Sequence, residues 1–463
     1  MNLGITKKEA VMLAVLISGA CVAVLNLTLM TPALPAIMVD TGVPQTTVQW
    51  LTSGYSITEA VVIPLAAYLM GRFSTRKLFI GGMGIFTLGS IIAAVAPVFA
   101  FILLGRVLQA VATGFMMPMV FSVILLVVPK ENRGTAMGLI GLVIGFAPTV
   151  GPPLAGVLVD TMGWREIFVV VSVISALIMV LAIFTLENYG SFERGKFDAL
   201  SVLLSSVGLV CLLYGFSSFS SAENHLVTLA LVVVGVVLVG LYARRQLHLD
   251  EPMLQLRILR VRGYLISVII LAIFQAALIG LETIIPLYIQ DVLGESATVS
   301  GLTLLPGSLI SAFAAVISGV WFDKMGVRRP AVVGTIILAV SVLFFFTLGP
   351  ASSVIWVAII YTLIWFGEQL AMTPIDTWGV NMLKPEEIRH SQSTTNTIIQ
   401  IGGSFGTALL VSVASAVSGA TVADSAAVTL FAGYHAAFIV SIVLTLVACA
   451  MIFIFVRDKK RRA

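Results

Sequence analysis

The sequence predicts an all-α polytopic membrane protein with fourteen transmembrane helices. Of the 463 residues, 59% are hydrophobic and only 10% are charged, whereas soluble domains carry roughly 25% charged residues. The apolar residues form runs of about 18 to 28, separated by short loops that carry charges, Pro or Gly, and about 20 apolar residues cross a bilayer as a helix. This pattern excludes a soluble globule.

The expected spans follow one another with nothing left for a soluble domain. The first span is too long for a signal-peptide core, carries Asn26 and has no small-residue cleavage site in a fitting place. We therefore interpret it as a transmembrane helix that is retained. The last span ends near Val456. The expected starts, in chain order, are Val11, Val48, Leu78, Phe99, Thr135, Ile167, Leu200, Leu226, Tyr264, Val299, Ala331, Val354, Thr394 and Phe431.

The basic residues indicate the orientation, because cytoplasmic loops collect Lys and Arg. We let the chain cross the membrane fourteen times, with Lys7 and Lys8 on the cytoplasmic side. Of the 26 basic residues, only Arg165 then lies on the outer side and only Arg106 lies within a span. Both termini are therefore predicted to be cytoplasmic. The net charge of +4 comes from scattered loop residues and a basic tail, which is typical of a topology signal and does not indicate nucleic-acid binding.

Residues that bind metals or act as nucleophiles do not form a recognisable pattern. Cys21, Cys211 and Cys449 lie in three different spans, which makes disulfides and thiolate metal sites unexpected. The four His residues have no metal-ligand spacing, and no nucleophile elbow or phosphate loop occurs. We expect neither an enzyme nor a protein with a bound metal or cofactor.

The chain contains an internal repeat. In the first helix, which we expect to include both residues, Pro35 precedes Asp40 by five residues, and in the ninth Pro286 precedes Asp291 by the same distance, at an offset of 251. "AYLMGRFSTRK" after the second span matches "GVWFDKMGVRR" after the tenth at an offset of 252. Spans one to six thus reappear as nine to fourteen, and seven and eight are an insert. The predicted units are two six-helix bundles at 1–187 and 263–463, joined by a linker and the inserted pair at 188–262.

These features resemble the major facilitator superfamily, in its fourteen-spanner drug:proton antiporter branch, over nearly the whole chain. The cytoplasmic signature of that family is matched in the second half by Gly319, Asp323, Gly326, Arg328 and Arg329. The resemblance implies that Asp323 is held by a neighbouring helix end and by Arg, which latches one conformation. The first half keeps Arg72, Arg76 and Lys77 but has Ala67, Gly71 and Ser74 at the other signature positions, so an N-half latch is not expected.

Two further motifs support the resemblance. "GRVLQAVATG" in the fourth span is similar to the buried Arg-x-x-Gln motif of the family, at Arg106 and Gln109. Because Pro removes helix hydrogen bonds and Gly permits close approach, the fifth span should bend and pack tightly. Small residues recur in the thirteenth span at Gly402, Gly403 and Gly406. The antiporter signature in the fifth span, "GFAPTVGPPLAG", is matched by Gly145, Pro148, Gly151, Pro152, Pro153 and Gly156.

The main departure from the branch is Asn26, which stands where its members typically carry Asp. An amide cannot release a proton near neutral pH, so the coupling must use another residue. Asn26 either hydrogen-bonds substrate or bridges helices, and the sequence leaves both open.

Carboxylates elsewhere in the spans are candidates for that coupling. Glu59, Glu282 and Glu368 each lie within a span, where a charge costs at least roughly 2.5 to 3.5 kcal/mol. Glu368 is the best candidate, because about 22 Å of helix separates it from either end of its span. Glu282 could instead lie in an outer vestibule, Asp376 could cap a helix end, and one acid could merely neutralise Arg106.

We predict that a proton and a cation compete for these acids, so that rocking between two states exchanges drug for proton. By the resemblance, the acids lie on helices that line a central cavity. Aromatic and thioether side chains near them suit organic cations. The expected substrate-binding residues are Asn26, Tyr55, Arg106, Gln109, Met116, Tyr361, Trp365 and Met372, and the expected proton-coupling residues are Glu368, Glu59, Glu282 and Asp376.

The leading hypothesis is a proton-coupled exporter of hydrophobic, cationic drugs in a plasma membrane, most plausibly the bacterial cell membrane. It needs no cofactor, because the proton gradient drives it, and we expect a monomer that interacts with protons, the lipid bilayer and small lipophilic cations. The alternatives are an exporter of a native metabolite or lipid-like compound and, from another class, a polytopic sensor.

Overall fold

The computed structural model describes residues 4–48, 50–188, 198–218, 225–249, 252–295, 297–420 and 426–457, and all regular elements in these ranges are helices. The N-terminal half contains α1 (Lys7–Thr28), α4 (Trp50–Arg72), α5 (Thr75–Ala94), α6 (Phe99–Val127), α7 (Arg133–Thr161) and α8 (Arg165–Thr185). The C-terminal half contains α11 (Arg262–Leu287), α12 (Ala297–Met325), α13 (Arg328–Leu343), α14 (Val354–Val380), α15 (Ile388–Ala420) and α16 (Ala426–Phe455). Between the halves come α9 (Ala199–Ser218) and α10 (His225–His248).

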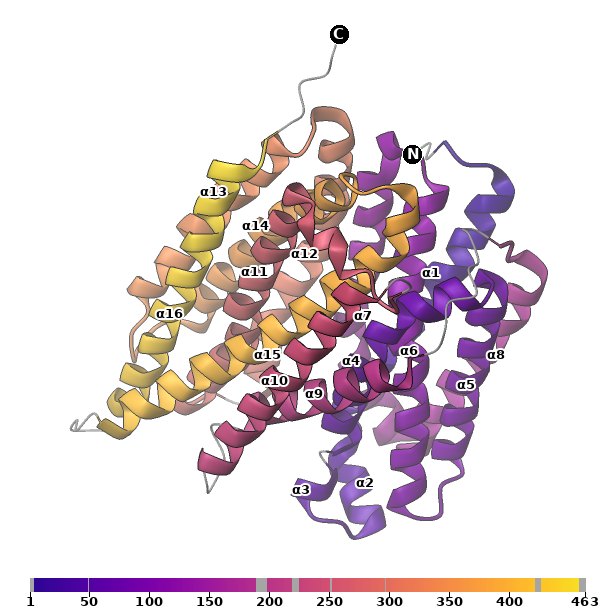
Figure 1. Ribbon diagram of the computed structural model, residues 1–463. Coiled ribbons are helices and arrows are strands. Elements are labelled where there is room, and N and C mark those ends of the chain that lie inside the picture. Colours follow the sequence, from indigo (N-terminus) through magenta and orange to yellow (C-terminus); the bar gives the residue numbers. More distant parts are fainter. Residues whose placement is uncertain are drawn as a thin grey trace.

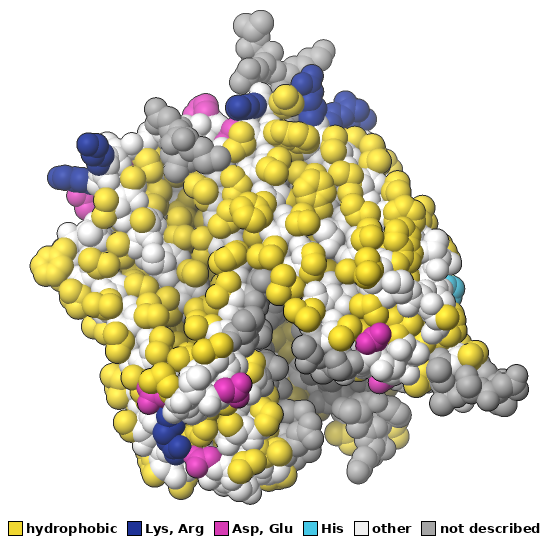
Figure 2. Space-filling model, turned by 180° about the vertical axis from the view of Figure 1, so that it is seen from behind, with side chains coloured by type: hydrophobic (Ala, Val, Ile, Leu, Met, Phe, Trp, Pro, Cys, Tyr) yellow, Lys and Arg dark blue, Asp and Glu magenta, His cyan; other side chains and the backbone are white. Residues whose placement is uncertain are grey.

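Thirteen of the described helices are long and apolar enough to span a membrane. The 29-residue α7 lies at the place of the predicted fifth span. On the face that Figure 2 shows, hydrophobic side chains form a broad band, and most of the charged side chains lie towards its two edges. This arrangement suits a bilayer. The count of fourteen crossings and the cytoplasmic termini stay predictions, although both ends of the chain lie at the same end of the molecule (Figure 1).

The helix that was predicted to continue through Pro35 and Asp40 is interrupted, which corrects the sequence-based expectation for the first span. After α1 ends at Thr28, the chain forms a 3-10 turn, then α2 (Leu34–Thr41) and α3 (Gln45–Val48). The matching segment in the second half leaves α11 through a π-helical turn at Tyr288–Val292. Both Pro-Asp segments of the repeat therefore mark the point where a long helix ends, since Pro removes a helix hydrogen bond.

The hydrophobic residues form one large cluster centred on each half, and the halves meet chiefly where α7 packs against α12 and where α15 packs against α4 and α6. In the first pair, α7 and α12 pack backbone to backbone through small residues. A Cβ at Gly138 would collide with the carbonyl oxygen of Ala315, and a Cβ at Gly145 would lie 3.2 Å from the Cβ of Ala312. Only glycine permits this close approach.

The second pair, α4 and α15, is joined partly through the inserted helix α9, which contacts both of them. Figure 1 shows α9 and α10 beside α15 and α4. The ring of Tyr214 on α9 stacks on Trp50 of α4 at 6.2 Å, and Phe216 meets Phe405 of α15 edge-on at 5.5 Å. The insert thus bridges the two halves.

Candidate transport site

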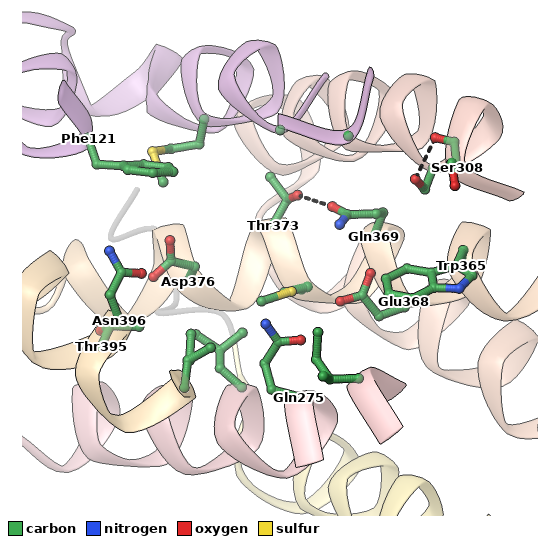
Figure 3. A pocket seen from close by; sticks show the side chains of 18 of the residues that line it. Phe121, Gln275, Ser308, Trp365, Glu368, Gln369, Thr373, Asp376, Thr395 and Asn396 are labelled. Atoms are coloured by element: carbon green, nitrogen blue, oxygen red, sulfur yellow. Dashed lines mark hydrogen bonds between the residues drawn. The ribbon is translucent and has the colours of Figure 1, made fainter. Parts of the chain in front are cut away.

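A cavity of about 340 Å³ lies between the two halves, and most of its wall belongs to the C-terminal half. Figure 3 shows its lining side chains converging from several helices. The N-terminal half contributes Phe121 of α6 and Met137, Gly141 and Gly145 of α7. At both glycines a Cβ would come close to an alanine of α12, Ala315 for Gly141 and Ala312 for Gly145.

One face of α14 carries two acidic, two aromatic and one methionine side chain that line the cavity. Glu368, Met372 and Asp376 follow one another at four-residue spacing and all line it. Glu368 is only 1% exposed, and its Oε2 atom has no hydrogen-bond partner among the described residues. Tyr361 and Trp365 continue the same face, with ring centroids 5.8 Å apart. The predicted juxtaposition of aromatic surface and acid on this helix is therefore present.

The structure also places the two acids whose positions the sequence left open. Glu282 of α11 lines the same cavity as Glu368, and its exposed side chain faces that space, so it does not lie in a separate outer vestibule. Asp376 lines the cavity as well, and α14 continues beyond it to Val380, so Asp376 is not a helix cap. Three of the four predicted acids thus surround one space.

Side-chain amides in the cavity were missed by the sequence analysis. Gln275 of α11, Gln369 of α14, and Gln392 and Asn396 of α15 all line it. Gln392 Nε2 lies 3.5 Å from Asp376 Oδ2, at the limit of a hydrogen bond. The signal was available, because polar residues on helices already expected to line a cavity are costly in a membrane unless they serve a purpose.

The predicted site residues of the N-terminal half form a second, separate cluster around Arg106. This residue is fully buried and donates to the carbonyl oxygens of Leu51 and Asn26, at 3.0 and 3.3 Å, and to Gln109 Oε1 at 3.0 Å. Its guanidinium lies over the ring of Tyr55, 4.2 Å from the centroid. These acceptors are neutral, and Nη2 has no partner among the described residues.

Asn26 takes part in this cluster as a bridge between helices. Its Nδ2 atom donates to Gln109 Oε1 at 3.1 Å, which links α1 to α6. Gln109 in turn donates to Ser90 Oγ at 2.8 Å, and the hydroxyls of Tyr55 and Thr113 lie 2.7 Å apart. Of the two roles that the sequence left open for Asn26, this conformation shows the bridging one.

Two further predicted residues lie close to this cluster along the chain. Glu59 is half-buried one turn after Tyr55 and does not line the 340 Å³ cavity. Met116 is buried and faces α5, where a Cβ on Gly82 would lie 2.8 Å from its sulfur. In this conformation Met116 is therefore a packing residue, whereas Met372 reaches the cavity.

The signature turn of the second half joins the two halves. Asp323 Oδ1 accepts from the backbone N–H of Gly134 at 2.8 Å, and Oδ2 accepts from Thr135 at 2.6 Å. The carboxylate thus caps the N-terminus of α7, where unpaired N–H groups and the helix dipole favour an anion. Gly326 has a φ of +80°, which allows the tight turn into α13. Arg328 and Arg329 are exposed beside this turn.

A second contact strengthens this junction. Arg133, the first residue of α7, donates to Asn381 Oδ1 at 2.9 Å, at the end of α14. In the first half, buried Gly71 stands at the position that matches Asp323, and Arg72 is exposed. The predicted asymmetry between the two signature turns is therefore present.

The glycines of the fifth span differ in their surroundings. A Cβ at Gly151 would collide with the Thr28 side chain of α1, as tight packing predicts, whereas nothing lies within 4 Å of Gly156. A Cβ at Gly319 would collide with the backbone of Gly134, so this signature glycine also permits close approach. The side chains of Pro148, Pro152 and Pro153 lie outside the described part, and tight packing at Gly156 was wrongly predicted.

Two helical bundles that enclose a cavity with buried acids define a multi-pass membrane transporter. Residues 16–407 match the Major Facilitator Superfamily, and the chain belongs to this family, whose members transport small molecules and are not enzymes. Similar bacterial proteins place it in the cell membrane as a multi-pass protein and relate it to multidrug efflux members of the family.

Three relatives match most of the chain. The uncharacterized MFS-type transporter YcnB of Bacillus subtilis is 39% identical over 460 residues, covering 98% of this chain and 97% of its own. The lincomycin resistance protein LmrB of Bacillus subtilis is 32% identical over a region that covers 89% of this chain and 86% of LmrB. A multidrug resistance protein B homolog of Mycobacterium tuberculosis is 30% identical and covers 85% and 75%.

Solved structures agree with the fold. The human organic anion transporter TETRAN superposes with a TM-score of 0.67 at 13% identity, covering 96% of this chain and all of its own. The proton:xylose symporter XylE superposes with a TM-score of 0.65 at 14% identity, covering 96% and 95%. At these identities the likeness establishes the fold alone.

Proposed function

We propose that the protein is a proton-coupled antiporter that exports hydrophobic, cationic small molecules by alternating access. It acts as a monomer, needs no cofactor and is driven by the proton gradient. The observation that carries this proposal is the Glu368 carboxyl group, buried in the wall of a central cavity with Oε2 unpartnered among the described residues.

An ionised carboxylate in such a position is costly, because burial removes its water and no basic group in the described part of the chain pairs with it. Either a proton or a cationic guest relieves this cost, and one excludes the other. When the cavity alternates between the two sides of the membrane, this competition exchanges substrate for protons. Glu282 and Asp376 in the same cavity give room for more than one proton in each cycle, and Glu59 is a further candidate in the N-terminal half.

The cavity wall and the relatives favour a cationic drug as the guest. Tyr361 and Trp365 offer aromatic faces next to Glu368, and such faces attract organic cations. Met372 adds a flexible apolar side chain. The names of the relatives refer to lincomycin resistance and multidrug resistance, which supports drug export here.

Alternating access requires that the contacts at Asp323 break and form again. In this conformation the Asp323 carboxylate and Arg133 join α7 to α12 and α14, close to the N-terminus of the chain, since Gly4 lies beside Asn132. Opening of the cavity at this end therefore needs the release of the cap on α7. The glycine packing between α7 and α12 provides the surface on which the halves rock.

The test uses proteoliposomes with an acidic interior and a pH-sensitive dye. Addition of tetraphenylphosphonium should release protons through the native protein, and Glu368→Gln should reduce this release at least tenfold, because an amide cannot carry a proton. Glu386→Gln is the matched control, since Glu386 is exposed, and it should behave as the native protein. Native rates of proton release in Glu368→Gln would remove this residue from the mechanism.

A further inference from the structure

The cavity has two chemically different ends along α14. At one end Glu368 lies near Trp365, and at the other Asp376 lies near Asn396 (Figure 3). Glu282 lines the same cavity, and Gln392 Nε2 lies 3.5 Å from Asp376 Oδ2. Glu368 and Asp376 are eight residues apart, which corresponds to about 12 Å along the helix axis. Side-chain amides lie at both ends, with Gln275 and Gln369 beside Glu368 (Figure 3). A ligand that occupies the cavity therefore meets an aromatic end with two carboxylates and a second end where a single carboxylate, Asp376, lies with amides.

The Glu368 end suits an ammonium group. Its carboxylate has an unpartnered oxygen among the described residues and a second carboxylate, Glu282, on the same cavity wall. The adjacent ring of Trp365 adds an aromatic surface for a cation. With two carboxylates at this end, a hydroxyl group would leave more negative charge uncompensated here than at Asp376.

The Asp376 end offers donors and acceptors together. Asn396 is half-buried and carries an amide with two donor hydrogens and one acceptor oxygen. Thr395 beside it already bonds the hydroxyl of Tyr264 at 2.9 Å, so Asn396 is the group left for a ligand. A ligand hydroxyl can donate to Asp376 and accept from Asn396 at once, whereas a purely apolar arm would bury both groups without a partner.

We infer that the preferred substrates are amphipathic amines with a hydroxylated arm, in which the ammonium binds at Glu368 and the hydroxyls bind at Asp376 and Asn396. This inference rests on the proposed function and names its substrate class. Two hydrogen-bond contacts of about 2.8 Å shorten the 12 Å separation to roughly 6 Å between the ligand atoms. A six-carbon polyol arm covers that distance, and a cavity of 340 Å³ holds a ligand of this size.

The test compares two amines that differ only in the hydroxyls of one arm. N-hexyl-D-glucamine carries a hexyl arm and a hydroxylated six-carbon arm, whereas dihexylamine carries two hexyl arms. Their binding to the purified protein in lipid nanodiscs is measured by calorimetry. Asn396→Leu should weaken the binding of N-hexyl-D-glucamine about tenfold, which corresponds to the loss of a buried hydrogen bond. The same change should not weaken dihexylamine and should tighten its binding, because it removes an amide that the second hexyl arm leaves unpaired.

Gln400→Leu is the control variant, and a diamine tests whether the Asp376 end recognises charge rather than hydroxyl groups. Gln400→Leu alters an amide on the same helix, one turn after Asn396, that does not line the cavity, and it should change neither amine. N-hexyl-1,6-diaminohexane replaces the hydroxyls by a second ammonium. If this diamine binds more tightly than N-hexyl-D-glucamine and loses that advantage in Asp376→Asn, the second end recognises charge and the inference is wrong.

The remaining outcomes separate this inference from the proposed function. If Asn396→Leu weakens both amines equally or neither, the hydroxyl contact is refuted, while proton exchange with dihexylamine would still support the antiporter. If the native protein binds neither amine and exchanges no protons with them, the antiport proposal fails and the substrate class fails with it.

Discussion

The two polar clusters of the molecule occupy matching helices of the repeat and are built in opposite ways. The Arg106 cluster lies on α6, and Glu368 lies on its repeat mate α14, but the charged positions do not correspond. At the offset of 256 that aligns Pro118 with Pro374, Arg106 matches Thr362 and Glu368 matches Ala112. The duplicated halves therefore carry opposite charges at different positions along matching helices. This difference indicates that the two charged residues have different roles.

Most of the donors of Arg106 have partners and only Nη2 lacks one in the described part, whereas the Glu368 carboxyl group lies in the wall of a cavity. Arg106 is held by two carbonyl oxygens, an amide and a ring, so its removal would take a donor away from several buried acceptors. Glu368 has an oxygen without a partner in the described part, so its neutralisation leaves nothing behind. Substitutions in the Arg106 cluster should thus mainly lower stability, whereas substitutions of the cavity acids should mainly impair transport.

The largest expected effect is on stability and comes from Arg106→Leu. This change removes the guanidinium that donates to the carbonyl oxygens of Leu51 and Asn26 and to Gln109 Oε1, and should lower the free energy of unfolding by about 3 kcal/mol or more. Glu368→Gln should leave the Tm unchanged, because it removes an unpaired buried charge. Thermal unfolding followed by tryptophan fluorescence in detergent measures both. A native Tm for Arg106→Leu would show that the N-terminal cluster is not an anchor.

A matched pair of Glu→Gln changes compares the halves directly. Glu282→Gln removes a cavity carboxylate and should weaken tetraphenylphosphonium binding about tenfold, as the loss of a close charge in a desolvated site does. Glu59→Gln, outside that cavity, should weaken binding less than threefold. Both are measured by calorimetry on the purified protein. The reverse order of effects would move the substrate site into the N-terminal half.

Restoring a carboxylate in the N-terminal cluster should change transport little. In Asn26→Asp the new acid would lie among the groups that hold Arg106 and pair with it, which ties up its charge. We expect drug-induced proton release within about threefold of the native rate and still dependent on Glu368. Proton release that survives in the double variant Asn26→Asp, Glu368→Gln would instead show that either half can carry the coupling.

The sequence predicted the parts of this architecture that depend on hydropathy and on the repeat. Helices α6 and α14 begin at Phe99 and Val354 as predicted, and the signature carboxylate of Asp323 caps a neighbouring helix. The helix starts follow from hydropathy and spacing, whereas the contact of Asp323 with a neighbouring helix end was implied by the resemblance to the family. The acids on α14 could also be placed on one face, because helical periodicity fixes that face before any packing is known.

The sequence could not predict which partner each polar group finds. The amide of Asn26 bonds Gln109, 83 residues away, and Asn396 meets Asp376 only because α14 and α15 line the same space. Likewise, the break after Thr28 was missed, because apolar residues continue through Pro35 into a second short helix. Contacts between helices depend on tertiary packing, which hydropathy does not encode.

The smallest expected effect concerns the inserted pair, which belongs to neither cluster. Asp198, ahead of α9, accepts from Arg245 Nε at 2.7 Å and Nη2 at 3.1 Å, and this guanidinium, with Ser201, lowers the pKa of Asp198 to about 2. Since the folded-state pKa lies below the ordinary value of 3.8, the pair stabilises the protein above pH 4 and loses this contribution as the pH falls towards 2.

We therefore expect Asp198→Asn to lower the Tm by about 2 °C at pH 7 and to remove part of the fall in Tm that the native protein shows between pH 4 and pH 3. Glu368→Gln is the comparison, because a carboxyl group without a basic partner has no ion pair to lose when it is protonated. The measurement is thermal unfolding over this pH range for the native protein and both variants. If Glu368→Gln flattened the pH dependence and Asp198→Asn did not, the acid of the cavity would be held by a basic group, and the contrast between the bonded N-terminal cluster and the unpaired C-terminal acid would be wrong.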